Sequence, residues 1–244
     1  MTLCAVIPVF RGAATVAGVV EELRRFSEEH EIPCRAVLVE DGSGDESREA
    51  VLDLAANSPG VTAILMDQNV GQQRALYVGI REAGGCDAVL TMDDDGAHPV
   101  ELLLPMLERL RAGAELCYAV PVRRGSALRR AGGWLRDQLF RTISRGVRVS
   151  SYRAMTAELA RKLRPEPDGF IYLSAAALRL RPRAECIFYE APQSRSSTYT
   201  AGRLVRLYAG LLTHYTPLRR IRPMRKLPDA SFRVVPGRGF LWQP

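Results

Sequence analysis

Short apolar segments alternate with longer segments of helical periodicity through the first 121 residues, and this alternation leaves few folds open. The segments that we expect to form strands cover residues 3–8, 35–40, 62–66, 88–92 and 115–120. The expected helices cover residues 14–30, 45–57, 71–83 and 100–112. Strands that alternate with helices in this way are typical of a parallel sheet with helices on its faces. The sequence therefore predicts an α/β fold.

The length and composition of the chain agree with one large domain. With 244 residues, of which 47% are apolar, the chain can bury a substantial core, and disorder throughout is excluded. Even the apolar region 204–218 contains Arg206 and His214, so we expect no membrane-spanning helix. The five cysteines lack the paired spacing of a metal site, and the N-terminus lacks a secretory signal. We therefore expect reduced thiols and a cytoplasmic protein.

The chain is basic, with a formal net charge of +7, and all but two of its 34 Lys and Arg residues are arginine. Arginine binds phosphate through parallel hydrogen bonds, so anionic partners are expected. The segments 122–149 and 204–226 combine apolar residues at helical spacing with many arginines. Each suits peripheral contact with an anionic membrane, or a helix packed on the domain with a solvated cationic face. Nucleic acid is disfavoured as a partner because no nucleic-acid recognition motif is found in the chain.

Three consecutive carboxylates directly follow an apolar strand in residues 88–99, whose sequence is AVLTMDDDGAHP. Successive strand side chains point to opposite faces, so we expect Asp93 and Asp95 to share a side and Asp94 to face away. Paired carboxylates suit Mg2+ or Mn2+ that carries the phosphates of a nucleotide. The alternative is a solvated acidic turn.

Polar or glycine-containing turns follow two other expected strands. Ligands of an open parallel sheet bind beyond the carboxyl ends of its strands. Asp41 follows the second strand, and Gly71 and Gln72 follow the third. Asp41 can accept a hydrogen bond from a ring N–H of a nucleobase, with an ordinary turn aspartate as the alternative. An apolar slot for the ring is expected at the end of the first strand, from Pro8, Val9 and Phe10.

Six segments of the chain follow one another in the order seen in family 2 glycosyltransferases. They are VIPVFR, VEDGSGDES, NVGQQRAL, TMDDDGAHPVE, SSYRAM and STYTAGRL. They extend over about residues 3–212, and within the family the chain resembles the branch that transfers sugars to polyprenyl or dolichyl phosphate. The resemblance implies a single GT-A domain, a Rossmann-like nucleotide-binding sheet with flanking helices.

The resemblance also implies a division of the chain into three parts. Residues 1–121 would form the half that binds the nucleotide sugar. Residues 122–200 would form the acceptor-binding half, including a basic amphipathic segment, and residues 201–244 a C-terminal helix and basic tail. The sequence leaves a homo-oligomer open.

Individual residues receive roles from the same resemblance. Asp41 matches the aspartate that recognises the base, and Asp93 and Asp95 match the residues that hold the donor diphosphate and its Mg2+ or Mn2+. Arg153 matches an arginine near the acceptor phosphate, so the expected catalytic residues are Asp93, Asp95 and Arg153. The expected nucleotide-binding residues are Pro8, Val9, Phe10, Asp41, Gly71, Gln72, Asp93, Asp94 and Arg124.

The chain departs from the family pattern at several positions. A glutamine that is usual two places after Asp95 is Ala97 here, which removes one metal ligand. The arginine of the membrane-facing acceptor loop is displaced, while Ser197 and Tyr199 match its serine and tyrosine. His98 stands directly before a proline, and we expect a turn residue or a neighbour of the site rather than a catalytic acid or base.

The acceptor decides what further chemistry the site needs. A phosphate acceptor is already an anion, whereas an alcohol needs a base, for which Asp168 is the candidate. We expect an inverting transfer from a nucleoside diphosphate sugar to a polyprenyl-phosphate-type acceptor. The alternative is a soluble hydroxyl acceptor such as a secondary metabolite, which the altered acceptor loop favours.

Overall fold

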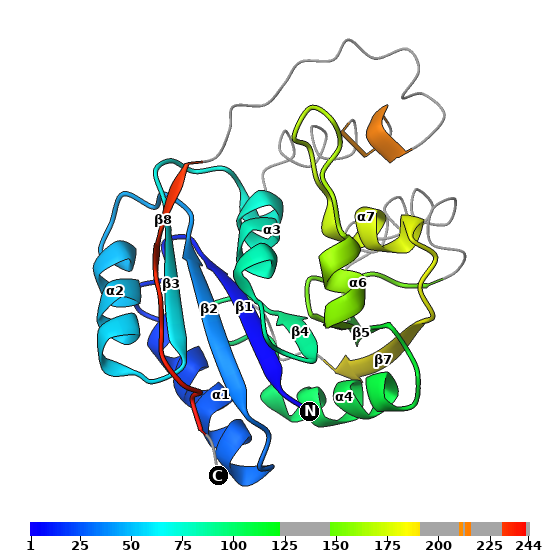
Figure 1. The fold of residues 1–244 in the computed structure, drawn as a ribbon, viewed down its shortest axis with the longest axis horizontal. Helices are drawn as coiled ribbons and strands as arrows, with labels where there is room; N and C mark the ends of the chain where they lie inside the picture. The colour runs from blue at the N-terminus through cyan, green and yellow to red at the C-terminus, as the bar shows by residue number, and fades with distance from the viewer. Residues whose placement is uncertain (123–146, 191–209, 212, 216–230, 243–244) are drawn as a thin grey trace.

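The computed structural model describes residues 1–122, 147–190, 210–211, 213–215 and 231–242. These residues form one mixed sheet in the strand order β7-β5-β6-β4-β1-β2-β3-β8 (Figure 1). Its strands are β1 (Leu3–Val9), β2 (Cys34–Glu40), β3 (Val61–Met66), β4 (Ala88–Thr91), β5 (Leu116–Val122), β6 (Arg153–Thr156), β7 (Ala184–Glu190) and β8 (Phe232–Val235).

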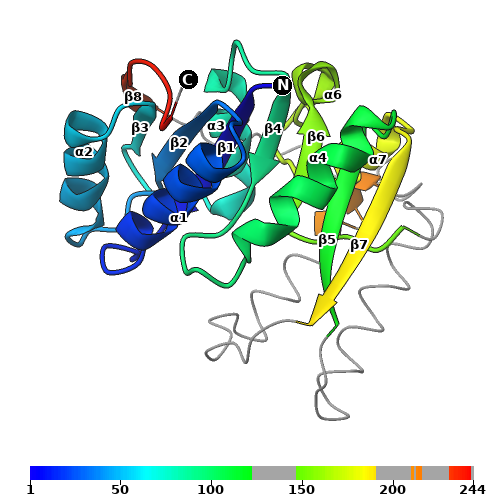
Figure 2. The ribbon, with the colours of Figure 1, turned by 90° about the horizontal axis from the view of Figure 1, so that it is seen from below.

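Helices cover both faces of this sheet. They are α1 (Val16–Glu29), α2 (Ser47–Asn57), α3 (Gln72–Glu82), α4 (Leu103–Arg111), α6 (Ala157–Lys162) and α7 (Leu173–Arg179). Helices α1, α2 and α4 share one hydrophobic core with the sheet, and α3, α6 and α7 share another (Figure 2). A short 3-10 helix, Val100–Leu102, leads into α4.

Strand β1 shows why two cores form. Leu3, Ala5 and Ile7 belong to the core under α1, whereas Cys4 and Val6 belong to the core under α3. A strand directs successive side chains to opposite faces, so a strand that is apolar throughout must be covered on both sides. All seven residues of β1 are buried, as this arrangement requires.

The five strands and four helices expected in the first 121 residues are all present, with strand bounds within two residues of the prediction. The expected parallel arrangement is confirmed for these five strands, which run in one direction, and two strands from later in the chain add antiparallel pairs. β6 runs antiparallel between β4 and β5, and β8 runs antiparallel beside β3. Both strands have only four residues, and each contains an arginine, Arg153 or Arg233, so neither reads as a strand from hydrophobic pattern alone.

All three predicted parts of the chain contribute to the same sheet, since β6 and β7 come from residues 122–200 and β8 from residues 201–244. The division into donor and acceptor halves stays a prediction. The basic segments 122–149 and 204–226 lie largely outside the described residues. Among the helices that the structure describes, none has the length and apolar character needed to cross a membrane.

Candidate active site

The carboxyl ends of β4, β1, β2 and β3 lie next to one another because these strands pair in parallel. The turns that follow them are therefore neighbours, although they are far apart in sequence. Ligands of open parallel sheets bind at this edge. The residues predicted for the donor site can be followed there one turn at a time.

Asp41, after β2, holds the loop that follows β3. Its carboxylate accepts hydrogen bonds from the backbone N–H groups of Val70 at 2.7 Å and Gly71 at 3.0 Å. The Asn69 side chain donates a third bond at 3.1 Å. Burial raises the pKa of Asp41 to about 6, although the two backbone N–H groups act in the opposite direction. Asp41 thus shapes this loop; a contact between Asp41 and a nucleobase stays a prediction.

Gly42 makes the close approach of the two loops feasible. Its φ of +62° lies in the left-handed region. A Cβ at this position would lie 2.4 Å from the backbone nitrogen of Asn69. Any other residue would therefore push the loop of Asn69 away from Asp41.

Asp93, after β4, is joined to two other elements. Gln72, the first residue of α3, donates from Nε2 to Asp93 Oδ1 at 2.6 Å. Ser151, ahead of β6, donates from its hydroxyl to Asp93 Oδ2 at 3.2 Å. Because Gln72 directly follows the loop that Asp41 holds, hydrogen bonds link the end of β2 to the acidic turn after β4.

Asp94, in the same turn, has different neighbours from Asp93. It packs against the turn after β1, where a Cβ on Gly12 would lie 2.0 Å from Asp94 Oδ2. Burial raises the pKa of Asp94 to about 6, opposed by a hydrogen bond from the backbone N–H of Phe10. Within the described residues, Asp94 Oδ2 is buried and has no hydrogen-bond partner.

Asp95 is exposed, and its Oδ1 accepts a hydrogen bond from the backbone N–H of Ala97 at 3.0 Å. β4 ends at Thr91, so strand alternation does not extend to Asp95, which lies in a turn. Whether Asp95 shares a cation with Asp93 stays a prediction.

The carboxylates of this turn have the chemistry that Mg2+ and Mn2+ prefer, because both ions bind oxygen ligands. In the described part of the chain, no group of three or more His, Cys, Asp or Glu side chains is arranged around a metal position. Mg2+ commonly binds proteins through one or two carboxylates and completes its shell with substrate phosphates and water. Asp93 and Asp95 fit that type of site.

At the end of β1, Pro8 and Val9 are buried within the strand, whereas Phe10 is 41% exposed. The guanidinium of Arg11 lies 5.5 Å from the Phe10 ring centroid. Of the three residues predicted to line a slot for the base, Phe10 therefore presents the accessible ring. Arg124, Ser197 and Tyr199 lie outside the described residues.

Arg153, the first residue of β6, is 1% exposed. Its Nε donates to the Thr91 hydroxyl at 3.0 Å, and one terminal nitrogen donates to the Ser174 hydroxyl at 2.8 Å. Its guanidinium also lies 6.0 Å from the ring centroid of Tyr118. No acidic side chain of the described residues forms an ion pair with it. Arg153 therefore ties β4, β6 and α7 together at the edge of the sheet where β4 ends.

Asp168 is buried and belongs to a pair that the sequence did not reveal. Its Oδ2 lies 3.2 Å from His214 Nε2, and the imidazole stacks on Phe170 with ring centroids 3.8 Å apart. His214 Nδ1 lies 2.5 Å from the carbonyl oxygen of Gly210, and burial lowers the pKa of His214. The two residues are 46 positions apart in sequence, so no local pattern connects them.

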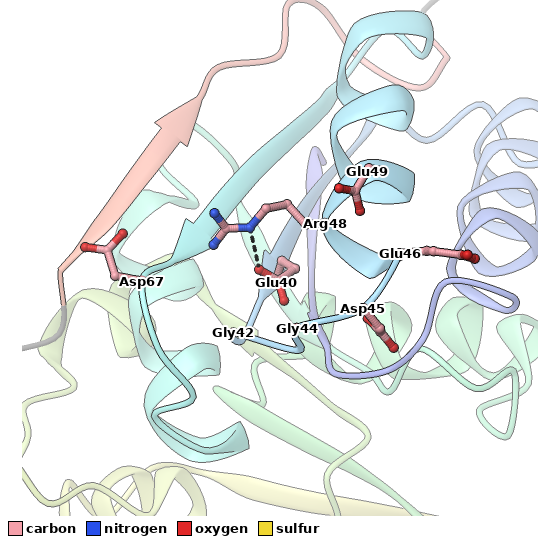
Figure 3. Close-up of a pocket in the computed structure, with 8 residues that line it drawn as sticks. All are labelled: Glu40, Gly42, Gly44, Asp45, Glu46, Arg48, Glu49 and Asp67. Atoms are coloured by element: carbon pink, nitrogen blue, oxygen red, sulfur yellow. Dashed lines mark hydrogen bonds and ion pairs between the residues drawn. The ribbon is translucent and has the colours of Figure 1, made fainter.

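A hollow of about 600 Å3 opens beside β2 and α2 (Figure 3). Arg48 donates to Glu40 at 3.3 Å and to the Met66 carbonyl oxygen at 2.7 Å. The acidic residues that line the hollow are Glu40, Asp45, Glu46, Glu49 and Asp67. Five carboxylates against one guanidinium disfavour a diphosphate, so this hollow is not the donor site that we infer.

The fold defines a class: an α/β protein whose polar turns meet beyond the carboxyl ends of its parallel strands. The Glycosyl transferase family 2 model matches residues 4–182, and the chain belongs to this family. The predicted glycosyltransferase class is thereby confirmed.

Relatives with named acceptors match different shares of the chain. A bactoprenol glucosyl transferase of Shigella phage SfV is 27% identical over 179 residues, which cover 71% of this chain and 58% of the relative. The chain thus spans less than two thirds of that relative. An undecaprenyl-phosphate 4-deoxy-4-formamido-L-arabinose transferase of Pseudomonas fluorescens is 27% identical over 240 residues, covering 94% of this chain and 68% of the relative.

Solved structures confirm the predicted GT-A fold class. Glucosyl-3-phosphoglycerate synthase from Mycobacterium tuberculosis, crystallised with UDP, superposes with a TM-score of 0.63 at 18% identity and covers 87% of this chain and 79% of its own. Mannosyl-3-phosphoglycerate synthase from Rubrobacter xylanophilus gives a TM-score of 0.65 at 17% identity and covers 93% and 79%.

Proposed function

We propose that this protein is an inverting, metal-dependent glycosyltransferase that moves a sugar from a nucleoside diphosphate to a polyprenyl-phosphate-type acceptor. The observation that carries the donor half is the acidic turn after β4, joined through Gln72 to the loop that Asp41 holds. The acceptor class is supported by the relatives, whose names specify bactoprenol and undecaprenyl phosphate.

In this proposal the nucleotide lies across the carboxyl edge of β1 to β4. Phe10 and the loop of Asp41 and Gly71 contact the nucleoside, while Asp93 and Asp95 bind Mg2+ or Mn2+. A cation held by these two carboxylates would neutralise the charge that develops on the departing diphosphate. A neighbour crystallised with Mn2+, UDP and phosphoglyceric acid supports a divalent ion at such a site.

A phosphate acceptor suits the groups on the acceptor side. It needs no base, and Asp168 is engaged with His214. We assign its recognition to Arg153, with Ser197 and Tyr199 in the acceptor loop, whereas Arg124 is assigned to the donor diphosphate. Arg153 is 1% exposed and donates from Nε to Thr91 and from one terminal nitrogen to Ser174, so contact with the phosphate requires this side chain to move from its present position.

A soluble hydroxyl acceptor is the second candidate, and the buried pair of Asp168 and His214 favours it. Asp168 would be the base, because both ring nitrogens of His214 already face oxygen atoms, those of Gly210 and Asp168. The names of two structural neighbours, glucosyl-3-phosphoglycerate synthase and mannosyl-3-phosphoglycerate synthase, also include phosphoglycerate, a small soluble compound.

The setting of the reaction is part of the same proposal. All five cysteines are free thiols, which agrees with a reducing cytoplasm. The arginine-rich segments would hold the protein at the inner face of an anionic membrane, where a lipid phosphate is found. A homo-oligomer stays a prediction.

Two measurements test this function. First, thermal unfolding is followed with UDP, GDP, CDP and dTDP, each with and without Mn2+, because a ligand that binds the native state raises Tm. One nucleotide should raise Tm, and more so with Mn2+. Second, transfer of labelled sugar from that nucleotide is measured with short-chain polyprenyl phosphate and with the matching polyprenyl alcohol. Transfer to the alcohol alone would reject the lipid-phosphate assignment, and no stabilisation by any nucleotide with Mn2+ would reject the donor site.

A further inference from the structure

His98 is a buried imidazole at the base of the acidic turn, only 7% exposed. Its Nδ1 accepts a hydrogen bond from the backbone N–H of Asp93 at 3.0 Å. The ring stacks on Tyr152, with centroids 4.6 Å apart and planes inclined by 8°. The Tyr152 hydroxyl donates to the Pro99 carbonyl oxygen at 2.7 Å. The imidazole is therefore held by the Asp93 N–H and by the Tyr152 ring, whose hydroxyl is itself bound to the residue that follows His98.

The hydrogen bond from Asp93 also sets the tautomer of the ring. A neutral imidazole that accepts at Nδ1 carries its proton on Nε2. That Nε2 lies 3.5 Å from Asp93 Oδ2 and 3.5 Å from the Ser151 hydroxyl oxygen. Ser151 in turn donates to the same carboxylate oxygen. One ring thus contacts both the backbone and the carboxylate of Asp93.

We propose that His98 is a positioning residue for Asp93, whose carboxylate it keeps directed toward Gln72 and Ser151. This inference rests on the proposed function, because that function assigns Asp93 to the donor diphosphate and its cation. His98 itself neither transfers a proton nor binds the donor. Its contribution is to fix a turn that follows the end of a strand and would otherwise allow several orientations of Asp93.

A positioning role and a purely structural role of His98 predict different experimental results. If His98 only filled space on Tyr152, any change that loosens this stack would lower stability and affinity together. If His98 orients Asp93, affinity for the cation depends on the hydrogen bond at Nδ1 rather than on the stability lost. Neighbours that orient a metal ligand typically contribute about 10- to 100-fold in affinity.

Three variants of the complete chain separate these roles. His98→Ala removes the acceptor at Nδ1, and His98→Asn restores an amide oxygen close to the Nδ1 position. Tyr152→Phe is the matched control, because it deletes the bond to Pro99 but keeps the ring stack. Circular dichroism and thermal unfolding first establish that each variant is folded.

Two readouts follow. Nitrogen-15 NMR of the metal-free wild type should show His98 protonated on Nε2 with an unprotonated Nδ1. Titration with Mn2+ alone, with free ion measured by electron paramagnetic resonance, should show binding weakened about 10-fold in His98→Ala and largely restored in His98→Asn. The Mn2+ affinity of Tyr152→Phe should stay within about twofold of the wild-type affinity, even if its Tm is lower.

Each contrary result has a distinct meaning. A proton on Nδ1, or wild-type Mn2+ affinity in His98→Ala, would overturn the positioning role alone. Equal weakening in Tyr152→Phe and His98→Ala would also overturn it, because any loss of stability in this turn, and not the bond at Nδ1 in particular, would then explain the effect. Absence of Mn2+ binding in the wild type would overturn the proposed metal site, and the positioning role with it.

Discussion

The molecule has two acidic regions: the turns at the carboxyl edge of β1 to β4, and the hollow beside α2. The carboxylates of these regions have different surroundings. At the edge of β1 to β4, Asp41 receives three hydrogen bonds from loop 69–71, and Asp93 receives one each from Gln72 and Ser151. In the hollow beside α2, Glu49 and Asp67 are exposed to solvent (Figure 3). The hollow holds more acidic side chains, yet the edge has the more defined geometry.

The difference shows that the number of carboxylates does not identify a site. Carboxylates that are partly withdrawn from water and oriented by donors from several elements present a fixed set of lone pairs to a ligand. Exposed carboxylates around an open hollow repel anions and keep their hydration. Variants at the carboxyl edge, in the hollow and at Arg153 on the acceptor side should therefore differ in their effects.

Asp95→Asn should have the largest effect. The change removes an anionic oxygen ligand, so metal-dependent sugar transfer should fall at least about 100-fold. Stability should change by less than about 0.5 kcal/mol because Asp95 is exposed and asparagine can still accept from Ala97. Initial rates at several Mn2+ concentrations measure the loss, with Asp67→Asn in the hollow as the matched control. Wild-type rates in Asp95→Asn would reject the metal assignment.

Arg153→Ala should destabilise the fold most. It leaves a cavity and removes the donors to Thr91 and Ser174, a combined loss of about 3 kcal/mol. Urea unfolding measures it, and Arg24→Ala on the exposed side of α1 is the control, with a smaller loss expected. If the folded variant still uses a lipid phosphate at the wild-type rate, Arg153 does not serve the acceptor.

Asp94 should make stability depend on pH. Its folded-state pKa of about 6 lies above the ordinary value of 3.8, so the unfolded chain releases this proton first as the pH rises. The stability that protonated Asp94 contributes is therefore present below about pH 4 and is lost as the pH rises to about 6. Relative to Asp94→Asn, the wild type should lose about 2 kcal/mol across this range.

The comparison between wild type and variant cancels the similar contribution of Asp41. Urea unfolding at pH 4, 5, 6 and 7 provides the measurement. Parallel stability curves for the wild type and Asp94→Asn would show that Asp94 has the same pKa in the folded and the unfolded chain, contrary to the effect expected from its burial.

Glu49→Gln in the hollow should have the smallest effect. This exposed residue should change stability by less than about 0.5 kcal/mol and leave the Tm increase caused by the donor nucleotide unchanged. A loss of nucleotide binding in this variant would show that the donor binds in the hollow and would reject our assignment of the donor site to the carboxyl edge.

The sequence predicts the donor edge well because its information is local. Three of the five expected strands run into the turns that carry Asp41, Gln72 or Asp93, and parallel pairing brings those turns together. The sequence does not predict the direction in which the side chains of these turns point. Asp41 was interpreted as a base-recognising residue, yet its carboxylate is occupied by loop 69–71, a contact between residues about 28 positions apart.

The acceptor side was less predictable because its contacts join distant segments. β6 is short, and its position between β4 and β5 depends on pairing with residues more than 30 positions away. The burial of Arg153 and the pair of Asp168 and His214 follow from that arrangement. The signal for α6 was present, since Thr156 caps the helix by accepting a hydrogen bond from the backbone N–H of Leu159.

Strand β8 has a practical consequence for anyone shortening this protein. The family match stops at residue 182, but β8 pairs with β3, and Leu241 donates from its backbone N–H to the Cys34 carbonyl oxygen at 2.7 Å. A truncated version ending where the match ends would uncover the rim of β3 along its whole paired length. Such an open rim recruits other chains, so the trimmed protein should precipitate where the longer one stays dispersed.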